Sequence, residues 1–158
     1  MDILKQWMAG LLLVLISFGA GASSPLLQLV LADKTVVNMD EAALAALPEV
    51  EFKTATPWTT GVHSYRGPTL ASLLASQGLK QVSIIDVIGL NGYRQRLDLS
   101  LFSGIPLTVT RFEDDKPLTR RNKGPLWLLM PFSAYPALDL PTIHSYMVWQ
   151  LIRLEVVQ

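Results

Sequence analysis

Turn signals and helix-breaking residues divide this chain into short segments, and this division limits the fold more than any other feature of the sequence. Only two segments carry helix signals. The first follows a capping-box pattern at 38–41 and covers 42–47, where Pro48 ends it. The second begins at the Gly-Pro pair at 67–68 and ends at Gly78, and it is expected to bury Leu70, Leu73 and Leu74. The helices of this domain are therefore expected to be few and short.

Most of the other segments have the composition of β-strands, being either continuously apolar or alternating in polarity. They lie at 26–32, 50–54, 82–88, 93–97, 107–112, 126–130 and 146–157. An Asn-Gly pair at 91–92 predicts a hairpin between two of them, and the segment 114–117 predicts another turn. Two short helices beside about seven strands predict an α+β fold, a mixed and β-rich single domain.

Residues 1–22 have the pattern of a secretory signal peptide. Lys5 precedes an apolar run from Met8 to Ile16, which is short for a bilayer span, and a small-x-small pattern follows at 20–22. We expect cleavage after Ala22, which leaves residues 23–158 as one domain outside the cytoplasm. The alternative is that the segment is retained as an N-terminal anchor.

The charge balance and the absence of cysteine exclude several kinds of function. Thirteen Lys and Arg balance thirteen Asp and Glu, so a strongly basic nucleic-acid-binding protein is not expected. A chain without cysteine has no disulfide, no thiolate zinc site and no cysteine nucleophile. Its two histidines, His63 and His144, are too few for a multi-histidine metal site.

Polar and aromatic residues gather in three segments, at 54–68, 91–96 and 120–127. The first leads from a predicted strand to a helix N-terminus and carries Trp58, His63, Tyr65 and Arg66. Together the three segments offer aromatic faces beside guanidinium groups, an arrangement that suits a flat heteroaromatic ligand with many acceptor atoms.

Each of these features also has a purely structural interpretation. Trp58 and Trp127 have the character of core residues, since aromatic side chains are usually buried. Arg94 and Arg96 lie on the same face of an alternating strand, which indicates a solvated face. The segment 120–123 has the composition of a basic surface loop, and the acidic pair at 114–115 falls in a turn.

Three segments, at 56–78, 115–131 and 148–156, resemble motifs of the oxidoreductase molybdopterin-binding domain of the sulfite oxidase superfamily, in the same order along the chain. In that family a tryptophan, a Gly-Pro or Gly-Val pair and a Leu-Leu helix follow the strand that bears the metal-binding cysteine. Here the corresponding features are Trp58, the pair at 67–68 and the leucines at 73–74. The resemblance covers residues 28–157 and implies the fold of that domain.

The chain departs from that family where the metal is bound. The cysteine position falls near residues 54–56, where this chain has threonines, and a hydroxyl is a poor replacement for a soft thiolate ligand. The sequence is similar to an offshoot of the family, exported pterin-binding proteins of the periplasm that regulate cyclic-di-GMP signalling. That resemblance implies a reduced pterin such as tetrahydromonapterin as the ligand, with no molybdenum. It also implies a partner: the periplasmic domain of a membrane-bound diguanylate cyclase or phosphodiesterase of the GGDEF/EAL type.

The resemblance also suggests which side chains contact the pterin. Trp58 and Trp127 are expected to form walls, with Tyr93 at the rim. The remaining candidates supply polar groups: Arg66 and Arg121 as donors, Lys123 and the Gly124 backbone at the far edge, and Thr56 at the former metal position.

The leading hypothesis is therefore a non-catalytic pterin-binding protein of the periplasm that relays pterin availability to a cyclic-di-GMP enzyme and so affects biofilm control. One alternative is a molybdenum-cofactor oxidoreductase, which the missing thiolate disfavours. The other is an interaction module of the periplasm whose pocket binds no ligand.

Overall fold

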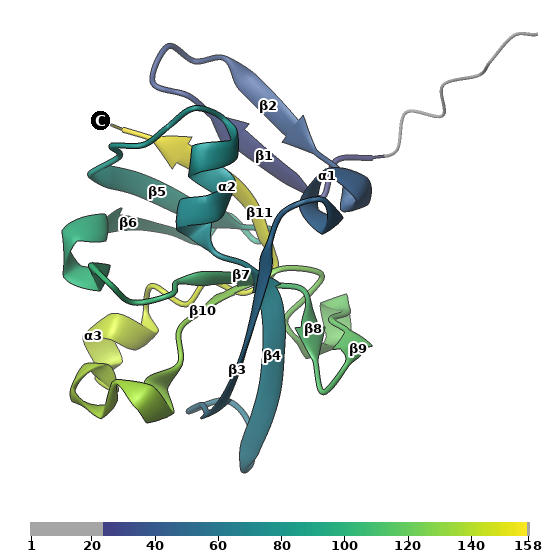
Figure 1. Ribbon diagram of the computed structural model, residues 1–158, viewed down its shortest axis with the longest axis vertical. Coiled ribbons are helices and arrows are strands. Elements are labelled where there is room, and N and C mark those ends of the chain that lie inside the picture. The colour runs from purple at the N-terminus through teal and green to yellow at the C-terminus, as the bar shows by residue number, and fades with distance from the viewer. Residues whose placement is uncertain (1–23, 158) are drawn as a thin grey trace, which may run out of the picture.

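A five-stranded sheet is the largest element of the computed structural model, which describes residues 24–157 (Figure 1). The expected signal peptide at 1–22 lies outside the described residues. Strand β1 pairs in parallel with β11, and the other neighbours in the sheet are antiparallel. The order is β2 (Val36–Met39), β1 (Leu27–Val30), β11 (Leu151–Val156), β5 (Ile84–Gly89) and β6 (Arg94–Asp98).

Two smaller sheets lie beside it. Strands β3 (Glu49–Ala55) and β4 (Val62–Pro68) form a long hairpin that extends away from the five-stranded sheet in Figure 1. The short strands β8 (Phe112–Glu113) and β9 (Lys116–Pro117) continue that sheet. A separate pair consists of β7 (Thr108–Thr110) and β10 (Trp127–Leu129).

The helices are short, as the sequence predicts. Two of the three α-helices begin at capped positions: α1 (Glu41–Ala45) after Asp40, and α2 (Leu70–Ser76) after Thr69, whose side chains accept the Ala43 and Ser72 amides. The third, α3 (Pro141–His144), begins with proline. The described residues also contain four 3₁₀ helices: η1 (Leu99–Phe102), η2 (Arg120–Asn122), η3 (Phe132–Ala134) and η4 (Pro136–Leu138).

One continuous hydrophobic core joins these elements. It contains Leu70, Leu73 and Leu74 of α2, which are buried as the sequence predicts. Its largest fully buried side chains are those of Trp127 and Tyr65, whose rings meet edge to face with centroids 5.6 Å apart. The small sheets therefore contribute aromatic rings to the same core that the large sheet covers.

The α+β prediction is confirmed, and several details of the predicted strands and helices are corrected. Residues 146–150 were expected to continue the last strand, but turn hydrogen bonds such as Met147 N–H to the His144 carbonyl hold the chain there, and the strand begins at Leu151. The segment 107–112 is divided between two sheets. Strand β2 was not predicted, because its burial pattern gives it only one fully buried residue, Met39. Strand β4 was not predicted either: residues 62–68 were expected to lead as a loop into a helix at the Gly-Pro pair, but they pair with β3 along its whole length, and α2 begins only after Thr69.

Among the described residues, no helix is both long enough and apolar enough to cross a membrane.

Candidate ligand-binding site

The loop after β3 holds Trp58 through its threonines. The Trp58 amide donates to Thr56 Oγ1 at 3.3 Å, and the hydroxyls of Thr56 and Thr59 are 2.6 Å apart. Thr59 in turn contacts the Tyr65 hydroxyl at 3.4 Å, so the loop is tied to the neighbouring strand β4. These short side chains fold the loop back and aim the indole at the segment that follows α3.

Trp58 is the centre of an aromatic group that we call the Trp58 cluster, consisting of Trp58, Trp127, Phe132, His144 and Trp149. The Trp58 ring meets Trp127 and Trp149 edge to face, with centroids 5.6 and 5.9 Å away. His144 approaches it from another direction, at 5.5 Å. Edge-to-face contacts of this kind are favourable and restrict the rings to defined orientations.

A cavity of about 350 Å³, which we call the Trp58 hollow, lies beside this cluster. Trp149 and Tyr93 are more than two-fifths exposed, so their rings remain available to a ligand. The Tyr93 hydroxyl donates to the Ser145 carbonyl at 3.0 Å, and this hydrogen bond fixes the ring at the lining of the hollow. The lining includes Trp58, Asn91, Tyr93, His144, Ser145 and Trp149.

Lys123 places a positive charge against the same indoles. Its backbone is in the left-handed region, with φ of 72°. Its Nζ lies 5.4 Å from the Trp127 ring centroid and 5.3 Å from that of Trp149, within the range of cation–π attraction. Within residues 24–157 no salt bridge engages Lys123. Its charge is thus balanced by aromatic faces and not by a carboxylate.

His144 is held by a carboxylate at the edge of the hollow. Its Nε2 lies 2.6 Å from Asp139 Oδ1, and its ring meets Phe132 edge to face at 5.3 Å. The carboxylate fixes the orientation of the imidazole, which leaves the ring as a rigid wall.

The structure brings five predicted site residues together and adjusts the role of two of them. Trp58 and Tyr93 line the hollow, and Lys123 lies against its indoles. Trp127 is fully buried and its Nε1 donates to the Met147 carbonyl at 3.3 Å, so it supports Trp58 from below, as in its core interpretation, and does not form a wall. Thr56 is buried and holds the loop that carries Trp58.

The other three predicted residues are not brought to the hollow. Arg66 is bound to Glu49 at 2.6 Å and lies over the Phe112 ring, 4.1 Å from its centroid. Arg121 lies on the exposed helix η2 and does not line the hollow. The Gly124 amide donates to the Thr119 carbonyl at 2.7 Å, and its Cα packs against Leu118, so this donor is already used.

Of the rings that line the hollow, those of Trp149 and His144 were not predicted from the sequence. Trp149 was assigned to the last strand because aromatic residues are typical of strands. His144 was considered only as a possible metal ligand. No local pattern marks either residue, because what brings them to Trp58 is the turn at 145–150, which depends on tertiary contacts.

The position expected for a metal ligand does not fit molybdenum. The Thr56 hydroxyl is engaged by Thr59 and by the Trp58 amide, and it is a hard, neutral oxygen. Residues 24–157 bring together no group of three His, Asp or Glu side chains that could hold a metal ion.

No family model matches the chain, and no curated protein matches its sequence. Among solved structures, the chain is similar to the sulfane dehydrogenase SoxCD from Paracoccus pantotrophus, with a TM-score of 0.61 and 16% sequence identity. The similarity covers 82% of this chain and 37% of that one, so the chain spans little more than a third of the dehydrogenase chain. At this identity the likeness shows a shared fold, and it is consistent with the fold that the sequence motifs imply.

Proposed function

We propose that this chain is a non-catalytic protein that binds a pterin in the Trp58 hollow. The observation that carries the proposal is the convergence of three aromatic side chains from separate segments, Trp58, Tyr93 and Trp149, on one cavity. Two exposed rings and one half-buried ring offer flat surfaces for a fused bicyclic ring system. The cavity volume of about 350 Å³ lies at the lower end of the usual range for ligand sites, which suits a small heterocycle.

The polar groups of the hollow complement the amino-oxo edge of a pterin. The side-chain amide of Asn91 supplies donors at the lining, while its Oδ1 accepts from the Tyr93 amide. The Ser145 hydroxyl donates to the Thr142 carbonyl and is left as an acceptor. His144 adds an imidazole that Asp139 keeps in one orientation. A ligand that lacked matching groups would leave some of these unpaired, at a cost of about 1–3 kcal/mol each.

The resemblance of the motifs to exported pterin-binding regulators is the support for the ligand's identity and for the relay. We propose a reduced pterin of the tetrahydromonapterin type, bound in the periplasm. The loaded protein then docks on the periplasmic domain of a membrane-bound diguanylate cyclase or phosphodiesterase and so controls cyclic-di-GMP. The dehydrogenase named in the structural comparison shares the fold, but the lack of a thiolate ligand in this chain argues against a metal-dependent redox activity.

Binding of tetrahydromonapterin to residues 23–158, followed by tryptophan fluorescence under anaerobic conditions, tests the proposal. We expect saturable quenching, because two of the three indoles in this segment line the hollow. Trp149→Ala should weaken binding about tenfold or more, since a stacked aromatic contributes about 1–3 kcal/mol to recognition of a planar ring. Val62→Ala, which shortens an exposed side chain on β4, is the matched control and should bind like the wild type.

The proposal fails if tetrahydromonapterin produces no saturable change and extracts of the purified protein contain no pterin by mass spectrometry. Equal affinity in Trp149→Ala and in the wild type would place the ligand elsewhere.

A further inference from the structure

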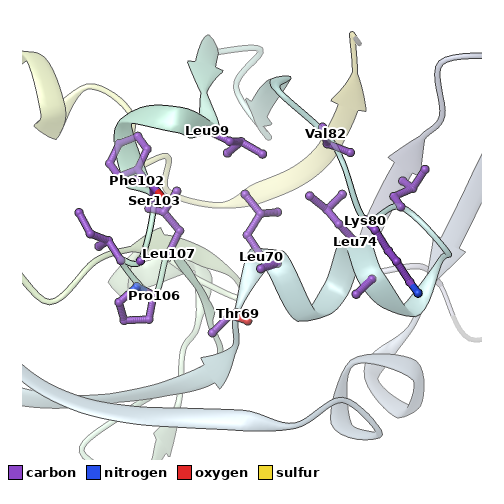
Figure 2. Close-up of a pocket in the computed structure, with 15 residues that line it drawn as sticks. Thr69, Leu70, Leu74, Lys80, Val82, Leu99, Phe102, Ser103, Pro106 and Leu107 are labelled. Carbon is purple, nitrogen blue, oxygen red and sulfur yellow. The ribbon is translucent and has the colours of Figure 1, made fainter.

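A second cavity, which we call the α2–η1 cavity, lies away from the Trp58 hollow and shares none of its residues (Figure 2). Its volume is about 860 Å³, within the range of ligand-binding sites in proteins. It is bounded by α2, by the segment 79–82 and by η1 with the following loop at 103–107. The Trp58 site makes no use of this cavity.

Hydrocarbon side chains form most of its wall. In Figure 2, Leu70 and Leu74 of α2 face Leu99 and Val82 across the cavity, and Phe102 lies toward one end. Leu70 and Leu74 are nearly fully buried and close the floor beneath the cavity. The partly exposed apolar residues of the lining are Leu79, Val82, Leu99 and Ile105. The exposed positions of α2 that line the cavity are Ala71 and Ala75, one turn apart, and their small side chains leave the cavity open along the helix.

The backbone of this wall is already hydrogen-bonded. The Leu70 amide donates to Leu107, the Leu107 amide to Ile105, and the Ile105 amide to Phe102, at 2.7 to 2.9 Å. The Thr69 hydroxyl accepts the Ser72 amide at 3.0 Å. A peptide could therefore not pair with these positions as an added β-strand, since strand addition requires free main-chain donors and acceptors. An occupant that needs no hydrogen-bond partners along its length, such as a hydrocarbon chain, fits better.

One cationic group stands at the end of the cavity opposite Phe102. Lys80 lines the cavity there, and within the part of the chain that the structure describes no salt bridge engages it. An anionic head group at this end would meet an ammonium group, while the apolar tail lies on the leucines. The charge and the apolar floor thus complement two different parts of one amphiphile.

We propose that the α2–η1 cavity binds a single-chain fatty acid, with its hydrocarbon chain along Leu79, Val82 and Leu99, above the leucine floor, and its carboxylate at Lys80. The proposal does not depend on pterin binding, because the two cavities have no residue in common.

Isothermal titration calorimetry of residues 23–158 with octanoate, decanoate and dodecanoate, each below its aggregation concentration, tests the proposal. Affinity should rise roughly 15-fold for each two added methylenes, as expected when each is removed from water. An affinity that does not change along the series would overturn the proposal.

Variants test the location. Ala75→Trp fills the cavity from the exposed side of α2 and should weaken dodecanoate binding at least tenfold, while Ala75→Ser should not change it. Ala71→Phe is a second filling variant, should Ala75→Trp fold poorly by circular dichroism. Dodecanoate binding that is equal in the wild type and in a folded filling variant is adsorption at another surface and overturns the proposal.

Lys80→Gln tests the head group. It should weaken dodecanoate binding about fivefold and leave 1-dodecanol binding unchanged, and Lys53→Gln on β3 is the matched control. Trp58→Ala should retain dodecanoate binding, and loss of binding there would contradict a separate site. Sedimentation of the protein with phosphatidylglycerol vesicles in the absence of fatty-acid binding would assign the cavity to a membrane surface and overturn the proposal.

Discussion

Arg96 on β6 donates from Nε to Oδ1 of Asp86 on β5 at 2.8 Å, and the two residues lie directly opposite each other in the sheet. Arg94 donates to the other carboxylate oxygen at 3.0 Å. The Asp86 side chain is only 5% exposed, whereas both arginines are largely exposed. The hydrogen bonds from Arg96, and then those from Arg94, lower the pKa of Asp86 despite its burial.

Replacing Asp86 by Asn should lower the free energy of unfolding by about 1–3 kcal/mol, because the amide cannot accept from both guanidinium groups and one polar group loses its partner. Urea denaturation at neutral pH measures the change. Glu51→Gln, at an exposed position on β3, is the control and should stay within about 0.5 kcal/mol of the wild type.

Acid should weaken the wild type more than Asp86→Asn. The folded-state pKa of Asp86 is lowered, so its stabilisation is present above the unfolded pKa of about 3.9 and is lost as the pH falls through the folded value. Urea denaturation from pH 6 down to pH 3 should therefore bring the two proteins closer together. A constant difference across that range would contradict the ion-pair account.

The His63 imidazole should titrate above its ordinary pKa of about 6.5. Its Nδ1 lies 2.7 Å from Asp114 Oδ2, and its Nε2 lies 2.9 Å from the Thr60 carbonyl. Both nitrogens face acceptors, so Asp114 first and Thr60 second raise the pKa of His63 by favouring the doubly protonated ring. This stabilisation is complete below the unfolded pKa and is lost as the pH rises through the folded one.

An NMR titration of His63 measures this directly. Asp114→Asn should bring the pKa of His63 back toward its ordinary value, and Asp115→Asn, at the neighbouring exposed position, should change it less. A His63 pKa at or below 6.5 in the wild type would contradict the geometry.

Gly67→Ala should destabilise the protein by about 3 kcal/mol, the upper end of the cost of overpacking. A Cβ at Gly67 would overlap the Val109 carbonyl and approach the Thr110 backbone, and backbone atoms cannot move aside as a flexible side chain can. Gly61→Ala is the matched control: it meets no atom within 4 Å, so only its φ of 81° opposes the change, at about 1–2 kcal/mol. Thermal or urea unfolding should separate the two variants, and equal costs would refute the steric argument.

Lys123→Met should weaken pterin binding severalfold while changing stability by only about 0.5–1 kcal/mol, the usual size of an exposed cation–π contact. The methionine keeps much of the length of the side chain and removes the charge over Trp127 and Trp149. Fluorescence titration measures affinity, and Lys53→Met serves as the control. Unchanged affinity would mean that Lys123 only packs against the indoles.

Local features of the fold could be predicted from the sequence, and long-range features could not. The Asn-Gly turn at 91–92, the end of α2 at Gly78, its buried leucines and the solvated arginine pair on β6 all depend on residues close together in the chain, and the structure confirms them. The parallel pairing of β1 with β11 joins segments that no local periodicity relates.

The site shows the same limit. Trp58 and Tyr93 were identified from polar-aromatic composition, and both line the hollow. Arg66 came from the same composition, but in the β3–β4 register it lies opposite Glu51 and its guanidinium is bound by Glu49, two residues along the same strand, so a nearby carboxylate decides its role. Trp149 reaches the hollow only because a turn delays the start of β11. Local composition therefore indicates which residue types belong to the site, but tertiary contacts decide which of these residues lie at the hollow.

The position of β11 between β1 and β5 has a consequence for how the molecule is made. Gln28 and Arg153, neighbours in this sheet, are 125 residues apart in the chain. Strand β11 is the only neighbour that β1 and β5 share, so without residues 151–156 the described sheet divides into the pairs β2-β1 and β5-β6, each with an unpaired edge. Completion of the sheet therefore depends on contacts that are distant in sequence, and a chain that lacks β11 would expose two strand edges to pairing with other chains.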